Sequence, residues 1–133
     1  MNGMKVLSRW SFMSSSVGRG TNTSTGWRQV KSLPKSVTIG PLKYDILTSP
    51  NVTHEGEDCF GLTDHDKLTV TLADDMPESL EQMIFCHELL HTFCLQTGLS
   101  VDSNEEEKLV LSLAPLLLQF IRNNPKAVEY LRG

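Results

Sequence analysis

The first 44 residues of this 133-residue chain contain no aspartate or glutamate, although they contain seven lysines and arginines. All sixteen acidic residues lie from residue 45 onwards, together with only five basic residues. An acidic domain repels the phosphate backbone, so the composition argues against nucleic acid as the main partner. The net charge of −4 therefore conceals a basic N-terminal segment and an acidic globular part.

The chain also lacks a hydrophobic run long enough to span a bilayer, and Pro115 interrupts the best candidate. It contains no hydrophobic secretory signal, and its three cysteines, Cys59, Cys86 and Cys94, are an odd number. Such a set makes a poor disulfide framework and fits a reducing compartment. We therefore expect a cytoplasmic protein without membrane contacts.

Low aliphatic content and many serines, threonines and glycines mark residues 13–26. This composition is typical of disorder. A basic, serine-rich and acid-free segment also resembles an organellar transit peptide, but no amphipathic helix accompanies the charges. We predict a disordered basic tail over residues 1–35 and one globular domain over residues 36–133.

The pattern of the domain indicates strands followed by helices. Residues 36–39 and 44–48 predict a first hairpin or an offset pair of strands, and residues 59–63 and 67–73 predict a second hairpin, with a loop over residues 48–58. Helices are expected over residues 78–95, from Ser103 with a kink or break at Pro115, and over residues 125–131. This order predicts the α+β class.

The sequence His87-Glu88-Leu89-Leu90-His91 places the motif H-E-x-x-H on the first predicted helix. Residues four apart lie on one face of a helix, so both imidazoles can reach one metal ion. Histidine suits Zn²⁺, and a catalytic zinc site keeps a position open for water, whose proton Glu88 can accept. The motif predicts a hydrolytic zinc site. The alternative is a pair of hydrogen-bonded core histidines.

A catalytic zinc site needs a third protein ligand. The extended motif, with glycine three residues after the second histidine and a third histidine three later, is excluded because Cys94 and Thr97 occupy those positions. His54 and His65 lie in predicted loops or turns, where a solvent-exposed role is commoner than metal binding. Cys94 shares the face of His87, but a small buried hydrophobe is the simpler interpretation.

Glu105, Glu106 and Glu107 open the second predicted helix, and a glutamate from such a helix can complete a His₂Glu site. Glu106 follows Ser103 in a capping-box pattern, which gives it a structural role. Glu107 shares a face with Val110 and should point inward. We predict Glu107 as the third ligand and Glu106 as its alternative. The run can also be explained as charges that complement the helix dipole.

Several segments resemble one family of proteins. They are residues 37–44 (VTIGPLKY), residues 60–63 (FGLT), the H-E-x-x-H motif, Glu106-Glu107 and residues 122–125 (RNNP). These segments are similar to the small phage- and prophage-encoded zinc metallopeptidase-like proteins related to the ImmA/IrrE metallopeptidase group. The resemblance covers residues 36–131. It implies a minimal zincin fold, in which a small antiparallel sheet packs on the motif helix and a later helix supplies a glutamate ligand.

The resemblance also implies a function. His87 and His91 would bind Zn²⁺ and Glu88 would act as general base, on a protein or peptide substrate in the host cytoplasm. A phage or host regulatory protein is a further expected partner. Members of the group often cleave or control repressors and carry a helix-turn-helix or sensor domain. We expect no room for such a domain within these 133 residues, and this departure from the family's pattern counts against repressor cleavage.

Two points of the mechanism remain open in the sequence. No residue falls at a recognisable position for stabilising the oxyanion, and Tyr44, His54 and His65 are the candidates. We expect an extended substrate to lie along the predicted strand over residues 67–73, which leads into the motif helix. The alternative from another class of protein is a non-catalytic zinc-stabilised module that binds a phage or host protein.

Overall fold

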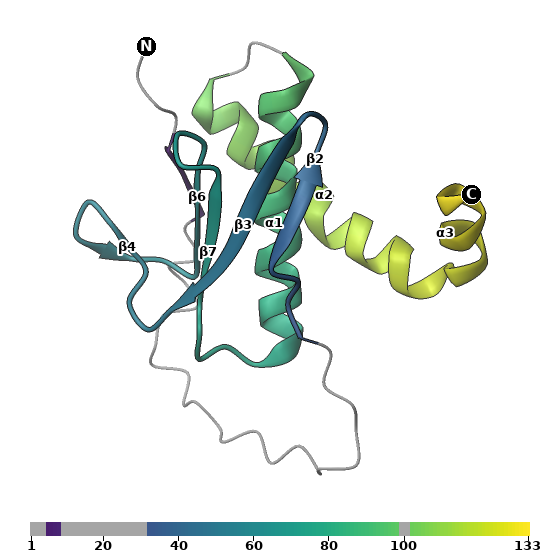
Figure 1. Ribbon diagram of the computed structural model, residues 1–133, viewed down its shortest axis with the longest axis horizontal. Coiled ribbons are helices and arrows are strands. Elements are labelled where there is room, and N and C mark those ends of the chain that lie inside the picture. The colour runs from purple at the N-terminus through teal and green to yellow at the C-terminus, as the bar shows by residue number, and fades with distance from the viewer. Residues whose placement is uncertain (1–4, 9–31, 99–101) are drawn as a thin grey trace.

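The structure is a computed structural model that describes residues 5–8, 32–98 and 102–133. Helices and strands both contribute, as the α+β prediction requires (Figure 1). In chain order the elements are β1 (Lys5–Ser8), β2 (Ser36–Ile39), β3 (Leu42–Ser49), β4 (Thr53–His54), β5 (Glu57–Asp58), β6 (Gly61–Asp64), β7 (Thr69–Ala73), α1 (Glu78–Thr97), α2 (Ser103–Asn123) and α3 (Pro125–Arg132).

Five strands form one sheet in the order β1-β6-β7-β3-β2. Both predicted hairpins are confirmed, because β2 pairs antiparallel with β3 and β6 pairs antiparallel with β7. The expectation of a purely antiparallel sheet is wrong, because β3 and β7 pair in parallel. The chain reverses through β4, β5 and β6 before β7 begins, so β7 runs in the same direction as β3. The segment predicted as a loop contains the small β4–β5 ribbon.

The predicted N-terminal tail over residues 1–35 lies mostly outside the described residues. Within it, Lys5–Ser8 form β1, which pairs antiparallel with β6 at one edge of the sheet (purple in Figure 1). The sheet therefore includes a strand from a segment for which the composition predicts disorder. A short strand gains its order from the partner that it joins, and composition does not report that partner.

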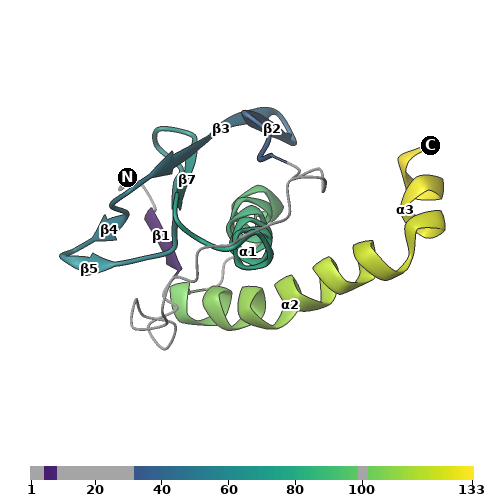
Figure 2. The ribbon, with the colours of Figure 1, turned by 90° about the horizontal axis from the view of Figure 1, so that it is seen from below.

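Helix α1 lies between the sheet and α2, which gives the domain three layers (Figure 2). Its sheet-facing side contributes Ile84 to a core that also contains Tyr44, Ile46, Val70 and Leu72. Its other side contributes Cys86 and Leu90, which pack against Val110 and Ala114 of α2. Helix α3 continues from the far end of α2, away from the sheet (Figures 1 and 2). Because α1 is covered on both sides, its polar side chains at these faces are buried.

The ends of the helices follow the predicted signals with one exception. Helix α1 ends at Gly98, whose φ of 70° lies in the left-handed region that favours glycine. Helix α2 begins after Asp102, whose side chain accepts a hydrogen bond of 2.8 Å from the backbone N–H of Glu105. The predicted capping box from Ser103 is therefore wrong by one residue. This leaves the side chain of Glu106 available for another contact.

A kink or a break was predicted at Pro115; helix α2 continues through this proline to Asn123, so the break does not occur. Proline removes one backbone hydrogen bond, to the carbonyl of Leu111. Leu111 and Pro115 are both exposed, so water can satisfy that carbonyl. None of the helices in the described part of the chain combines the length and apolar character needed to cross a membrane.

Candidate metal centre

The motif residues lie on the buried, sheet-facing side of α1. His87 and Glu88 have no exposed surface, and His91 is 1 % exposed. Burial of three polar side chains in one helical turn is costly unless each finds a partner. The partners of these residues therefore indicate what the site can do.

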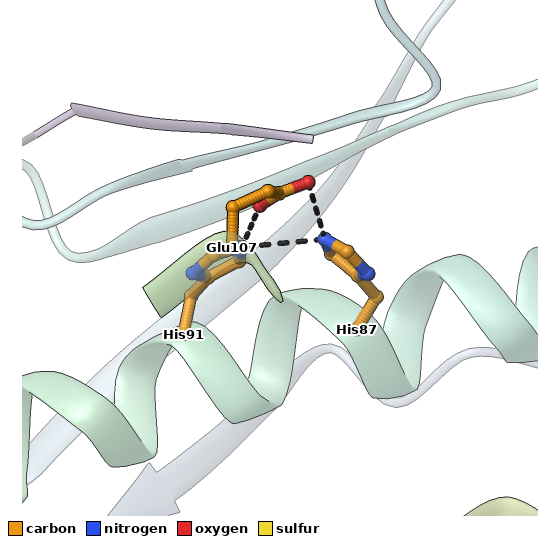
Figure 3. Close-up of side chains that lie close together, drawn as sticks. All are labelled: His87, His91 and Glu107. Atoms are coloured by element: carbon orange, nitrogen blue, oxygen red, sulfur yellow. Dashed lines mark hydrogen bonds and ion pairs between the residues drawn. The ribbon is translucent and has the colours of Figure 1, made fainter. Parts of the chain in front are cut away.

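Glu107, the fifth residue of α2, meets both histidines (Figure 3). The Nε2 atoms of His87 and His91 are 3.2 Å apart. One carboxylate oxygen of Glu107 lies 2.9 Å from Nε2 of His91, and the other lies 3.5 Å from Nε2 of His87. Ligand atoms at zinc–ligand distances around a tetrahedral ion are about 3.3 Å apart. The three side chains are therefore spaced as ligands of one metal ion.

The protonation of His91 follows from its second contact. Its Nδ1 lies 2.7 Å from a carboxylate oxygen of the buried Glu106. An ionised carboxylate only accepts hydrogen bonds, so Nδ1 donates, and in the neutral ring Nε2 presents a lone pair. That lone pair faces the carboxylate of Glu107, and the two repel each other unless a cation or a proton lies between them. Metal-binding histidines commonly donate their other N–H to a carboxylate, as His91 does here.

The structure separates the three candidate glutamates. Glu107 lies with both histidines, Glu106 contacts the opposite nitrogen of His91, and Glu105 is exposed. The sequence reasoning missed the contact of Glu106 because the capping-box pattern gave this residue another role. A signal was present, since Glu106 lies four residues before the buried Val110 and so faces inward as well.

The charges of the site agree with this arrangement. Burial raises the pKa of Glu107, but hydrogen bonds and charge interactions with His87 and His91 outweigh it and hold that pKa at about 2. Burial lowers the pKa of His91, and the carboxylates of Glu107, Glu88 and Glu106 outweigh this effect, so it is raised. Without metal, a proton on His91 therefore compensates the ionised Glu107. A divalent cation can take the place of that proton.

Glu88 lies one residue from His87 and is held by the sheet. The hydroxyl of Thr63 in β6 donates a hydrogen bond of 2.5 Å to its Oε1. Burial raises the pKa of Glu88 to about 7, although the charge of His91 and the hydrogen bond from Thr63 both act to lower it. A carboxyl group with a pKa near 7 can accept and return a proton at neutral pH.

Gly61 lets β6 lie close to Glu88. A Cβ atom at this position would lie 2.8 Å from Cγ2 of Ile84 and 3.1 Å from Oε2 of Glu88. Gly61 and Thr63 belong to residues 60–63, one of the segments that carry the resemblance, but no role was predicted for either. Thr63 fell within a predicted strand, but which strand residue faces the helix depends on how the sheet packs, and no local pattern encodes that packing.

Two of the three oxyanion candidates lie together. The hydroxyl of Tyr44 is 3.0 Å from Nδ1 of His65, and Nε2 of His65 is buried with no hydrogen-bond partner among the described residues. Burial lowers the pKa of His65, and the charges of Glu106 and His91 also act on it. The pair is thus within electrostatic reach of the centre. His54 lies instead in the β4–β5 ribbon.

The remaining expectations concern other parts of the chain. Strand β7 has a neighbour on each side, so it offers no free edge along which a substrate could lie, and that expectation is wrong. Cys59 and Cys86 are buried, and Cys94 is partly buried. Cys94 packs against the core between α1 and α2 and does not join the metal-binding group.

Comparisons with protein-family models, with curated protein sequences and with solved structures give no match for this chain. The functional interpretation therefore depends on the residues and geometry of the centre.

Proposed function

We propose that this protein is a zinc-dependent hydrolase of peptide bonds, with His87, His91 and Glu107 as metal ligands and Glu88 as general base. The observation that carries the proposal is the convergence of the three ligand side chains within 4.8 Å. Two imidazoles and one carboxylate suit zinc, whereas magnesium and calcium prefer oxygen ligands alone. Glu88 beside them is the acid–base group that a purely structural site does not need.

Each nearby residue has a distinct task in this proposal. Bound zinc would lower the pKa of a water molecule and polarise the substrate carbonyl. Glu88 accepts a proton from the attacking water and later donates it to the leaving amine. Thr63 fixes the orientation of the Glu88 carboxyl group, and Glu106 orients the ring of His91 so that Nε2 faces the ligand group.

The resemblance to the ImmA/IrrE-related metallopeptidases supports the same assignment. It implies the same two histidines, the same general base and a glutamate from the 105–107 run. We further propose that residues 36–131 form a minimal zincin-like domain. The parallel pairing of β3 with β7 departs from the small antiparallel sheet that the resemblance implies.

The test of the proposed function is Glu88→Gln, which keeps the size of the side chain but removes its ability to accept a proton. We expect the variant to retain zinc and fold, and to hydrolyse dye-labelled casein at least a hundredfold more slowly than the wild type. Glu81→Gln is the matched control on the same helix and should retain activity. Full activity of Glu88→Gln with zinc bound would contradict the proposal.

A second candidate function is favoured by the burial of the centre. His87 and His91 are almost completely buried, and only Glu107 among the proposed ligands has a partly exposed side chain, at 25 %. A closed site is typical of structural zinc, so the chain would then be a zinc-stabilised module that binds a phage or host protein. Under this alternative the zinc-loaded wild type hydrolyses no casein, and removal of zinc unfolds the domain.

A further inference from the structure

Strand β1 lies immediately beside the residues that hold Glu88. Among the described strands its only neighbour in the sheet is β6, and the register places Val6 opposite Thr63 and Ser8 opposite Gly61. Thr63 donates the hydrogen bond to Glu88, and Gly61 makes room for its carboxyl group. Helix α1 contacts β1 as well. The backbone of β1 thus runs past the proposed general base.

Figure 3 shows β1, in purple, above His91 and Glu107 in this view. In Figure 2 the same strand lies beside α1 near the start of α2, the element that carries Glu107. The pairing register places β1 beside Gly61 and Thr63, the two residues of β6 that approach Glu88. A peptide substrate would need to reach Glu88, and in the structure a segment of the chain itself lies alongside these two residues.

An extended backbone is the natural ligand of a sheet edge, because an edge strand offers a row of unpaired N–H and C=O groups. Without β1, the outer edge of β6 would present such a row beside Glu88. The main-chain ladder supplies affinity without reading a particular sequence. Charge adds a preference, since residues 1–44 carry only basic charges and the rest of the chain is acidic.

We propose that the outer edge of β6 is a binding site for extended basic peptides, and that Lys5–Ser8 fill it as an intramolecular competitor. A peptide from outside binds there only when β1 leaves. The inference rests on the proposed function in one respect, which is that Glu88 then accepts the proton of the water that attacks the bound peptide. Binding along β6 requires neither zinc nor hydrolysis.

Two features make β1 suitable for displacement. It is a four-residue strand that, within the described part of the chain, pairs on one side only, and short segments of this kind open at lower free energy than the core. Its attachment to the same chain raises its effective concentration to the order of millimolar, so it outcompetes dilute peptides. Weakening β1 should therefore increase the apparent affinity for an added peptide.

The experiment measures the dissociation constant of a fluorescein-labelled synthetic peptide with the sequence of residues 1–12, by fluorescence anisotropy. It uses the full chain with Glu88→Gln, so that the probe is not cleaved. The test variant adds Val6→Pro and Leu7→Pro. Alternate residues of an antiparallel strand point their N–H groups to the partner, so one of two adjacent prolines must remove a hydrogen bond to β6. We expect the probe to bind at least tenfold more tightly to this variant.

Three controls accompany the measurement. Ser14→Pro with Ser15→Pro, outside β1, should leave the dissociation constant unchanged, and a probe that itself carries both prolines should not bind. Lys5→Glu places a second acid opposite Asp64 and weakens β1 without proline. The Lys5→Glu variant should bind the probe several-fold more tightly than the protein with intact β1. It replaces the proline variant as the test if circular dichroism shows that the proline variant is unfolded.

Equal dissociation constants with intact and weakened β1, or no binding to any variant, would overturn the inference. These results are separable from a failure of the proposed function. One outcome is tighter peptide binding by the variant with weakened β1, together with no hydrolysis of casein by the zinc-loaded wild type. That outcome would reject the proposed hydrolase and support the peptide site. If the wild type hydrolyses casein but weakening β1 leaves the dissociation constant of the peptide unchanged, only the role of β1 as a competitor would be rejected.

Discussion

In the metal-free protein, Glu88 should make the stability fall as the pH rises. Burial raises the pKa of Glu88 from 4.5 to about 7 in the folded state. The folded protein therefore binds this proton more tightly than the unfolded chain does. The stabilisation is fully present below about pH 4.5 and is lost as the pH rises towards 7. The difference between the two pKa values corresponds to roughly 3 kcal/mol in the free energy of unfolding.

Glu88→Gln removes this dependence, because the amide does not titrate and can still accept the hydrogen bond from Thr63. After treatment with a chelator, urea unfolding from pH 5 to pH 8.5 should show the variant gaining about 2–3 kcal/mol over the wild type. Other titrating groups are common to both proteins and largely cancel. Glu105→Gln, an exposed control on α2, should follow the wild-type curve. Parallel curves for wild type and Glu88→Gln would refute this reasoning about the buried carboxyl group.

Three further predictions concern the neighbours of the ligands. Thr63→Val should retain zinc but lower kcat by roughly tenfold or more. It should also move the acidic limb of the pH–rate profile to higher pH, because the hydrogen bond from Thr63 lowers the pKa of Glu88 and its loss raises that pKa. Thr63→Ser should restore both kcat and the profile. Gly61→Ala should lower the free energy of unfolding by about 1–3 kcal/mol in urea titrations, since its Cβ would collide with Cγ2 of Ile84 at 2.8 Å and crowd Oε2 of Glu88 at 3.1 Å, and an unchanged midpoint would contradict the close approach. Glu106→Gln should weaken zinc binding by about 10–100-fold in competition with a chelator while leaving the site intact, and unchanged affinity would argue against its orientation of His91.

Local patterns in the sequence were sufficient for most elements of the fold. The alternation around Val70 and Leu72 predicted a half-buried strand, and both side chains are fully buried in the sheet. Gly98 ended α1 as predicted. The parallel pairing of β3 with β7 and the addition of β1 were not predictable in this way. Both depend on contacts between segments far apart in the chain, which hydrophobic periodicity does not specify.

The same division applies to the candidate site. A single helical turn fixes the relation between His87 and His91, so their spacing alone predicted that the two rings lie together. The inward face of α2 predicted that Glu107 lies beside them. Thr63 and Gly61 reach Glu88 from the sheet, through tertiary packing that leaves no trace in the sequence. Glu106 was assigned to a capping box because Ser103 matches the capping pattern as well as Asp102 does. The structure shows that the N-cap is Asp102, one residue earlier.

The measurement that tests the central claim most directly is the zinc content of the purified protein by elemental analysis, before and after reconstitution. The wild type should bind about one zinc ion per chain, as a His₂Glu site requires. Glu107→Gln should lose most of that zinc, whereas the matched variant Glu105→Gln, two residues away on the exposed side of α2, should keep it. Undiminished zinc in Glu107→Gln, or no zinc in the reconstituted wild type, would contradict the proposed centre.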